Sequence, residues 1–350
     1  MSKKNKSMLV KLIANPNAGN KDASDAADKL KMVIGYLEKN GLEVDVAFTT
    51  PKEEATQVAR RAGKNGYKVI IAMGGDGTIE AVMRGMVGSK ARLGIIPAGT
   101  ENNIAKSLGI PSDLVEACAL IASDNTLKLD VGQVKTRKGK KFVFFELATV
   151  GLSATIYPDA NKVTSGKLSS IKATALTFFH QETKPKISLT FNDESKIEVE
   201  TMLVMVSNTP IFGKNFMVSP EASLQDGLLD ISTYPDFSKV ELLRYYAAVM
   251  DEGYSGDKEA QHYKARKLKI KASPKLDVMA DGVALGRGTV TIKALPGALR
   301  VITTEKSIGA ESPKKDAAEI VPGPVSPKMR KKKPKESVIS LGESSAQGKG

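Results

Sequence analysis

The stretch KVIIAMGGDGT, residues 68–78, decides the fold of this chain. Residues 69–73 form a short, continuous apolar run rich in β-branched side chains, which is typical of a central parallel strand buried on both faces. Three of the next four residues are glycines. Glycines lack a Cβ atom and let a ligand approach the backbone amides, and a helix that starts near Thr78 presents its positive end to phosphate. The stretch therefore predicts a phosphate-binding turn between a strand and a helix.

Asp76 would lie among the phosphates of such a ligand, where an isolated carboxylate would repel them. The residue makes sense if it meets Mg²⁺ or takes a proton from an attacking hydroxyl. For GGDGT alone, a plain tight turn with a solvated Asp is the alternative. A helix over 79–87 and a second buried strand over 93–96 then lead to PAGTENNIAKSLGIP, residues 97–111. The chain thus places two Gly-Thr turns at the ends of two predicted parallel strands.

The first 123 residues alternate between strand and helix patterns. An apolar strand over 8–14 runs into the loop NPNAGN, residues 15–20, and a strand over 44–48 precedes a second helix rich in Ala and Arg. This alternation predicts a doubly wound parallel sheet. Ligands bind beyond the carboxyl ends of the strands in such sheets, and all the Gly-rich turns fall there.

From residue 127 onward, short β-type runs separated by turn signals replace the helical periods, and they predict a second domain that is an antiparallel β-sandwich. We expect a nucleotide-binding α/β domain over 1–127, a β-rich domain over 128–304 whose last strands can return to the first domain, and a disordered basic tail over 305–350. Two helical segments, 167–180 and 240–250, are either amphipathic covers on the sheet or the walls of an apolar groove. The expected strands are 129–134, 142–147, 187–191, 197–207, 228–233, 268–272, 276–280, 290–292 and 299–303.

The two Gly-Thr turns and the Asn-Pro-x-x-Gly loop resemble those of the diacylglycerol kinase catalytic-domain family, which includes sphingosine, ceramide and bacterial lipid kinases. GGDGT alone would also fit the NAD kinases, but residues 97–102 do not resemble their second motif. The resemblance covers residues 8–303. It implies ATP- and Mg²⁺-dependent transfer of phosphate to the hydroxyl of a lipid such as diacylglycerol, in a cleft between the two domains. The resemblance makes 128–304 the lipid-substrate domain, in which the apolar groove would hold an acyl or isoprenoid chain.

The resemblance also implies site residues. The side chain of Asp226 and the carbonyls of Ser223 and Leu228 would hold a structural Mg²⁺. Asp76 is the expected catalytic base, as proposed for the aspartate of this turn in sphingosine kinases. The expected ATP contacts are Asn15, Pro16, Asn17, Ala18, Gly19, Thr50, Gly74, Gly75, Asp76, Gly77, Thr78, Ile79, Glu80 and Thr100.

Three positions depart from the pattern of the bacterial relatives. Val283 stands where their Asp-Gly-Glu carries the proposed proton acceptor, Glu80 replaces an Asn, and Asn102-Asn103 replaces Asn-Asp. Because valine cannot accept a proton, a nucleotide-binding pseudokinase with a sensing or scaffolding role is the runner-up to a lipid kinase. An NAD kinase is a weaker third interpretation.

The composition fits a cytoplasmic enzyme that visits membranes. The chain has 350 residues with 41% hydrophobic side chains, no Trp, and a formal charge of +13, which favours polyanions or an anionic membrane surface. Few aromatics argue against nucleic acid as a partner. The single cysteine, Cys118, is expected in the core. The histidines have no Cys or acidic partners at the spacing of zinc ligands, so we expect no zinc site. No signal peptide or membrane span is evident in the sequence. Six of the eight residues 328–335 are basic, so we expect the tail to contact anionic lipid peripherally. The oligomeric state stays open, a dimer included.

Overall fold

The computed structural model describes residues 8–15, 23–49, 52–123, 125–151, 184–212, 216–217, 219, 221–235, 237–238, 240–242 and 260–304. Segment 167–180, most of 240–250 and tail 305–350 lie outside these residues, so the expectations for them stay predictions. No helix in the described ranges is long and apolar enough to cross a membrane.

The first half of the chain forms the predicted parallel sheet. Its strands β1 (Met8–Ala14), β2 (Leu42–Phe48), β3 (Val69–Gly74) and β4 (Arg92–Pro97) lie in the order β2-β1-β3-β4. Every residue of β3 is buried because helices cover both faces of the sheet. This is the environment that its unbroken apolar sequence predicts.

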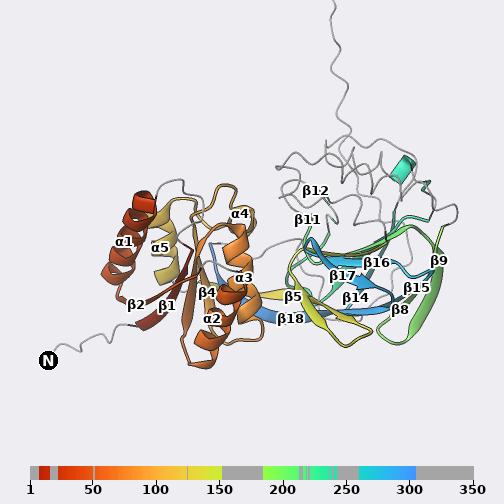
Figure 1. Cartoon of the computed structure of the whole chain (residues 1–350), viewed down its shortest axis with the longest axis horizontal. Coiled ribbons are helices and arrows are strands. Elements are labelled where there is room, and N and C mark those ends of the chain that lie inside the picture. Colours follow the sequence, from red (N-terminus) through yellow and green to blue (C-terminus); the bar gives the residue numbers. More distant parts are fainter. Residues whose placement is uncertain are drawn as a thin grey trace, which may run out of the picture.

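Two pairs of helices form these covers, and Figure 1 shows one pair on each face of the sheet. Ile70 and Ala72 pack toward α2 (Lys52–Lys64) and α3 (Asp76–Met86), whereas the alternate residue Ile71 packs toward α1 (Ala23–Lys39) and α5 (Leu114–Ser123). Cys118 of α5 is buried in the second of these cores, as expected.

The parallel sheet continues into the second half of the molecule through its longest strand. Strand β18 (Val290–Ile302) pairs parallel with β4, at Val301 and Leu93, and antiparallel with β5 (Thr126–Thr136) and β15 (Lys267–Ser273). The antiparallel strands β8 (Lys186–Phe191), β9 (Ser195–Glu200) and β6 (Lys141–Phe144) complete a ten-stranded mixed sheet. Because β5 and β18 run through both halves, they connect the two cores directly.

A second, six-stranded antiparallel sheet packs on the antiparallel part of the first. Its order is β14 (Gln261–Ala265), β13 (Leu229–Thr233), β10 (Leu203–Ser207), β7 (Leu147–Gly151), β16 (Asp277–Ala280) and β17 (Val283–Arg287). A short hairpin, β11 (Ile211–Phe212) with β12 (Phe216–Met217), stands apart. Apolar side chains of both sheets, such as Phe144 and Val204, share one core. The predicted α/β domain with an antiparallel β-sandwich is confirmed.

Two strand predictions were wrong in detail. The run 197–207 is two strands in two sheets, β9 and β10, because the chain changes sheets at Thr201, whose hydroxyl donates to the carbonyl of Leu203 at 3.0 Å. The runs 290–292 and 299–303 belong to one strand, β18, which keeps its pairing with β5 across an irregularity between Leu295 and Leu299. A bulge of this kind bends a strand without ending it.

Candidate active site

Two glycine turns meet where β3 and β4 end. A Cβ atom added to Gly99 would lie 2.3 Å from the Cα of Gly75, and one added to Gly75 would lie 3.2 Å from the Cα of Gly99. Both distances are too short for ordinary packing, so the two backbones approach each other as only glycines allow. The carboxyl ends of two neighbouring strands therefore meet in one surface that carries no side chain at Gly75 or Gly99.

Asn102 holds the second turn in shape. Its Oδ1 accepts the Gly99 N–H at 2.9 Å and its Nδ2 donates to the Gly99 carbonyl at 3.0 Å. The residue has a left-handed backbone, with φ 54°, which Asn tolerates better than most residues. It precedes the short helix α4 (Asn103–Ser107). The Asn102 side chain thus fixes the backbone of the turn at Gly99.

Asp76 joins the two turns. It is the first residue of α3, and its Oδ1 accepts the N–H of Ile104 in α4 at 2.8 Å. Its Oδ2 accepts no hydrogen bond from any residue that the structure describes. Helix α3 starts here rather than at Thr78, and its first amides have no acceptor within the helix. One carboxylate oxygen of Asp76 is structural, and the other is available at the edge of the amide surface.

Gly77 and Ile79, also predicted to contact ATP, lie in the first turn of α3, and the Ile79 side chain is buried in the core. The other predicted contacts, apart from Glu80, lie as follows. The Nδ2 of Asn15 lies 3.4 Å from the Oγ1 of Thr78, which brings the end of β1 to the same site. Gly74 packs against the side chain of the buried Thr78, whereas Thr100 is exposed. Pro16, Asn17, Ala18, Gly19 and Thr50 lie outside the described residues.

Glu80 points away from a simple phosphate contact, because its carboxylate pairs with Arg84 one turn along α3. Arg84 Nη2 also lies 3.4 Å from Oδ2 of Asp281, and Nη1 donates to the carbonyl of Val143. The guanidinium stacks over the ring of Phe142, 4.2 Å from its centroid. Arg84 therefore connects the helix that follows the first glycine turn to the sandwich half.

Asp281 is the acceptor at the centre of this connection. Its Oδ2 accepts the N–H of Phe145 at 2.7 Å, and its Oδ1 accepts those of Glu146 and Leu147, both at 3.1 Å. Burial raises the pKa of this carboxyl to about 6, although these amides and Arg84 oppose the shift. These bonds occupy the gap between β6 and β7, which is why the predicted strand 142–147 ends at Phe144.

Val283 begins β17 directly after the Asp281-Gly282 turn, in which both residues have positive φ. This is the two-residue hairpin that Asp-Gly favours. The Val283 side chain is 43% exposed, although it is apolar. The backbone of the family's Asp-Gly-Glu segment is thus formed, while the carboxylate that the relatives carry there is replaced by an exposed isopropyl group.

The three residues predicted to hold a structural metal lie in one tight turn. Asp226 Oδ1 accepts the N–H of Leu228 at 2.9 Å, and Ser223 Oγ accepts that of Gln225 at 3.2 Å. The Asp226 side chain is 3% exposed, and within the described ranges its Oδ2 has no hydrogen-bond partner; Lys264 Nζ stands 3.9 Å from it. A buried carboxylate oxygen without a hydrogen-bond donor among the described residues suits a hard cation. No larger group of His, Cys, Asp or Glu side chains able to bind metal occurs in the described ranges.

Asp130 supports this turn from β5. Its Oδ2 accepts the N–H of Gly227 at 2.5 Å and its Oδ1 that of Gly297 at 2.7 Å, and burial raises its pKa. Sequence reasoning passed over Asp130 and Arg84, and it included Gly99 only as part of the second Gly-Thr turn. Arg84 carried one visible signal, an acidic residue four positions earlier on the same helix face. The contacts of Asp130 join residues almost a hundred positions or more apart, which no local pattern reveals.

Comparison with known proteins agrees with this geometry. Residues 9–134 match the family model of the diacylglycerol kinase catalytic domain, and residues 129–303 match that of the YegS C-terminal NAD kinase beta sandwich-like domain. The chain belongs to the diacylglycerol kinase catalytic-domain family. Membership in this family explains both halves of the fold and the glycine turns at the candidate site.

Relatives in this family extend over most of the chain. The diacylglycerol kinase of Bacillus subtilis is 28% identical over 279 residues, covering 78% of this chain and 88% of the relative. That of Mycobacterium tuberculosis is 26% identical over 296 residues, covering 84% and 94%. A solved diacylglycerol kinase structure from Bacillus anthracis, 23% identical, covers 85% of this chain and 97% of that one with a TM-score of 0.62 and shares its fold. Lipid kinase activity is thus the function of the family to which this protein belongs.

Proposed function

We propose that the protein transfers the γ-phosphoryl group of ATP to the hydroxyl of a lipid such as diacylglycerol. The observation that carries the proposal is the close approach of Gly75 and Gly99, with Asp76 joining their turns. Two glycine backbones in contact leave no side chain there to keep a phosphate chain from the first amides of α3. The names of the bacterial relatives supply the substrate class.

The chemistry that this site offers is mainly positioning. Phosphoryl transfer through a loose transition state needs aligned reactants and neutralised charge more than it needs a strong base. The amides at the start of α3 would hold phosphate oxygens. The free Oδ2 of Asp76 would accept the proton of the lipid hydroxyl, a role for which Val283 offers no carboxylate.

Magnesium would bind at two sites, with a different role at each. Bound with ATP it neutralises phosphate charge, and Asp76 is the nearest candidate for contact with it. In the sandwich half, Asp226 would hold a structural Mg²⁺ together with the carbonyls of Ser223 and Leu228, as the unpartnered Oδ2 of Asp226 suggests. Lys264 lies within reach of this oxygen and of Asp230, so it would compete with the metal.

The experiment is transfer of labelled phosphate from ATP in Mg²⁺ to a panel of lipids, with wild type and Asp76→Asn. The asparagine keeps Oδ1 and with it the hydrogen bond to Ile104, so ATP should still bind. Turnover should fall by ~10² to 10⁴, the usual contribution of general base catalysis. Asp25→Asn on the exposed surface of α1 is the matched control and should keep full activity. Full activity of Asp76→Asn would remove Asp76 as base and as essential metal contact.

A nucleotide-binding pseudokinase is the second candidate, and the exposed Val283 favours it. Val283→Glu restores the family's carboxylate on the same hairpin. If the wild type transfers no phosphate and Val283→Glu does, the natural protein is the pseudokinase. If the wild type already phosphorylates a lipid, Val283→Glu should leave the rate unchanged or raise it. Adding NAD to the acceptor panel tests the third interpretation, since transfer to NAD instead of lipid would refute the lipid kinase.

Contact with an anionic membrane through the tail is part of this proposal. A kinase without a spanning helix in its described ranges must visit the interface to reach a lipid. The basic cluster 328–335 would supply about 1 kcal/mol per basic residue near an anionic surface, screened by salt.

A further inference from the structure

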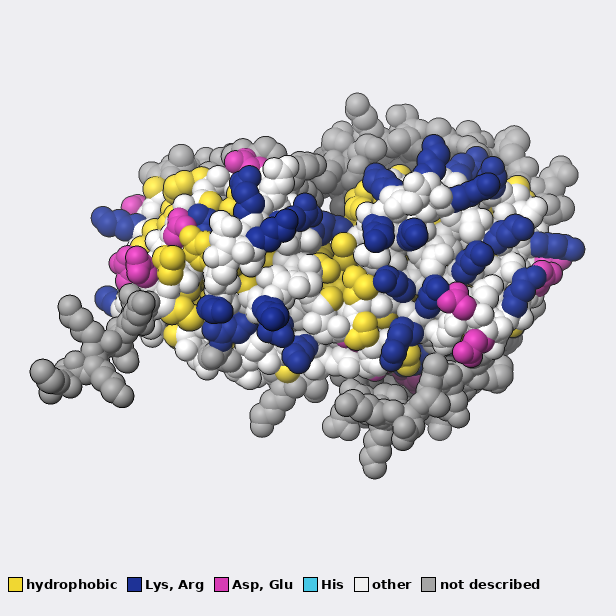
Figure 2. Space-filling view, turned by 90° about the horizontal axis from the view of Figure 1, so that it is seen from below, with side chains coloured by type: hydrophobic (Ala, Val, Ile, Leu, Met, Phe, Trp, Pro, Cys, Tyr) yellow, Lys and Arg dark blue, Asp and Glu magenta, His cyan; other side chains and the backbone are white. Residues whose placement is uncertain are grey.

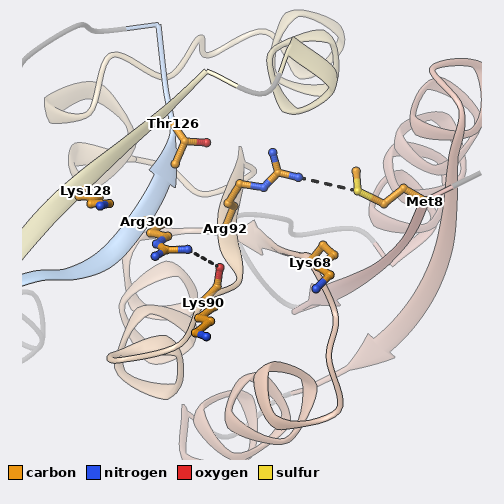
Figure 3. Close-up of a pocket in the computed structure, with 7 residues that line it drawn as sticks. All are labelled: Met8, Lys68, Lys90, Arg92, Thr126, Lys128 and Arg300. Atoms are coloured by element: carbon orange, nitrogen blue, oxygen red, sulfur yellow. Dashed lines mark hydrogen bonds between the residues drawn. The ribbon is translucent and has the colours of Figure 1, made fainter.

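A basic pocket of about 540 Å³ lies at the opposite end of the parallel sheet from the glycine turns. Five of its seven lining residues are cationic and none is acidic in the described part of the chain. Figure 3 shows them around the hollow, drawn from the starts of four strands, from β18 and from the loop before β4. The lining residues are Met8, Lys68, Lys90, Arg92, Thr126, Lys128 and Arg300.

The position of the pocket separates it from the nucleotide site. Lys68 directly precedes β3 and Arg92 begins β4, whereas Gly74 and Pro97 end the same two strands. Six residues of strand span about 20 Å at ~3.3 Å each. The phosphate groups of one ligand cannot bind at both ends of these strands at once. The pocket is therefore separate from the nucleotide site.

Two of the cationic side chains contact neutral acceptors, and four of the five form no ion pair with a residue that the structure describes. Arg300 Nη1 donates to the carbonyl of Lys90 at 3.2 Å, an acceptor that leaves the net charge unchanged. Arg92 Nη2 lies 3.8 Å from the sulfur of Met8, a weak neutral acceptor. None of the ion pairs formed between described residues includes Lys68, Lys90, Lys128 or Arg300. Like charges gathered from distant segments repel, and an anion between them would offset that repulsion.

We propose that this pocket binds a small soluble anion that carries two or more phosphate groups. Its volume is in the range of small-molecule sites, and its donors match such a ligand because Arg bonds phosphate in a fork while Lys supplies a point charge. A single phosphate would leave part of this charge unused.

A membrane surface fits the pocket less well than a soluble anion. Figure 1 shows α4, which follows β4, at the upper end of the parallel sheet, and the view from below in Figure 2 therefore looks onto the end where the strands begin. Lys and Arg recur across that view. A bilayer on this side would hold the glycine turns at the far end of the sheet, away from its lipids.

The experiment is calorimetric titration of the full chain with inorganic pyrophosphate, and separately with inorganic phosphate. The pocket variant carries Lys68→Gln and Lys128→Gln. The matched control carries Lys269→Gln and Lys271→Gln, which remove the same charge from exposed positions of β15. Pyrophosphate should bind the wild type at least tenfold more tightly than phosphate does. In the pocket variant, the affinity of this binding step for pyrophosphate should fall tenfold or more. In the control, the affinity should stay within twofold of the wild type.

Pyrophosphate bound at the glycine turns does not confuse the result, because that step persists in the pocket variant. An unchanged titration of the pocket variant would overturn the proposal, as would equal weakening in the control, which would indicate general charge attraction. Phosphate that binds as tightly as pyrophosphate would also overturn it. In a parallel arm with phosphatidylglycerol vesicles, a pocket variant that loses vesicle binding but keeps every pyrophosphate step would assign the pocket to a membrane instead.

Discussion

Replacing Gly99 with Ala tests the contact between the two glycine turns. The new Cβ would lie 2.3 Å from the Cα of Gly75 and 2.8 Å from the Oδ1 of Asn102. Carbon atoms pack at about 3.5 to 4.0 Å, so the turns must separate by more than 1 Å. Overpacking of this size costs ~1 to 3 kcal/mol of stability, which the fold can survive. A displacement of about 1 Å in a positioning site is expected to lower kcat/KM for ATP by ~10².

The assays are urea unfolding, calorimetric titration with ATP, and phosphate transfer from ATP. Gly35→Ala in α1 is the matched control, because a Cβ there meets nothing within 4 Å and a helical Gly→Ala change should stabilise the fold by about 0.5 to 1 kcal/mol. It should leave ATP affinity and turnover unchanged. If Gly99→Ala binds ATP and turns over like the wild type while the control does too, the two turns do not act as one phosphate site, and the central argument for the function is wrong.

Three further predictions concern other parts of the molecule. Because burial raises the pKa of Asp281 from 3.8 to about 6, the folded state binds its proton more tightly, and the free energy of unfolding should fall as pH rises from about 4 to 6. Asp281→Asn should flatten that slope in urea unfolding series and leave the parts due to Asp230, whose pKa burial also raises to about 6, and to Asp130, whose pKa burial raises as well; an unaltered slope would contradict the assignment. Millimolar Mg²⁺ should raise the melting temperature of the wild type but not of Asp226→Asn, so an equal rise in both would exclude this carboxylate as a ligand. Deleting residues 305–350 should weaken binding to anionic vesicles at low salt while barely changing turnover of a short-chain soluble lipid, and equal vesicle binding would leave the tail out of the mechanism.

The sequence predicts the parallel half of the fold well because its signals are local. The apolar run of β3 needs cover on both faces, and the glycines after it mark the strand end directly. Asp76 could be placed among the phosphate turns for the same reason. The hydrogen bond from the Ile104 N–H to Oδ1 of Asp76 could not be predicted, because it joins two helices, α3 and α4, that follow different strands.

Other features depend on contacts between distant segments. The basic pocket gathers Met8, Lys68 and Arg92 because three neighbouring strands start together, and Arg300 joins them from the end of β18. Each lysine or arginine alone has the pattern of an ordinary surface residue. Thr201, where one apolar run divides between two sheets, has no Gly or Pro beside it to mark the break. Patterns of period two report burial on a sheet face but do not identify the sheet.

The late position of β18 in the chain has a consequence for how this protein is made. During synthesis, β4 emerges from the ribosome roughly 200 residues before Val301, the partner of Leu93, and at 5 to 20 residues per second the wait is ~10 to 40 s. Throughout that interval the nucleotide half has its helices but lacks the strand that closes one edge of its sheet, and exposed sheet edges favour association between chains. The nascent chain therefore completes the sheet of its first half only when its second half is nearly finished.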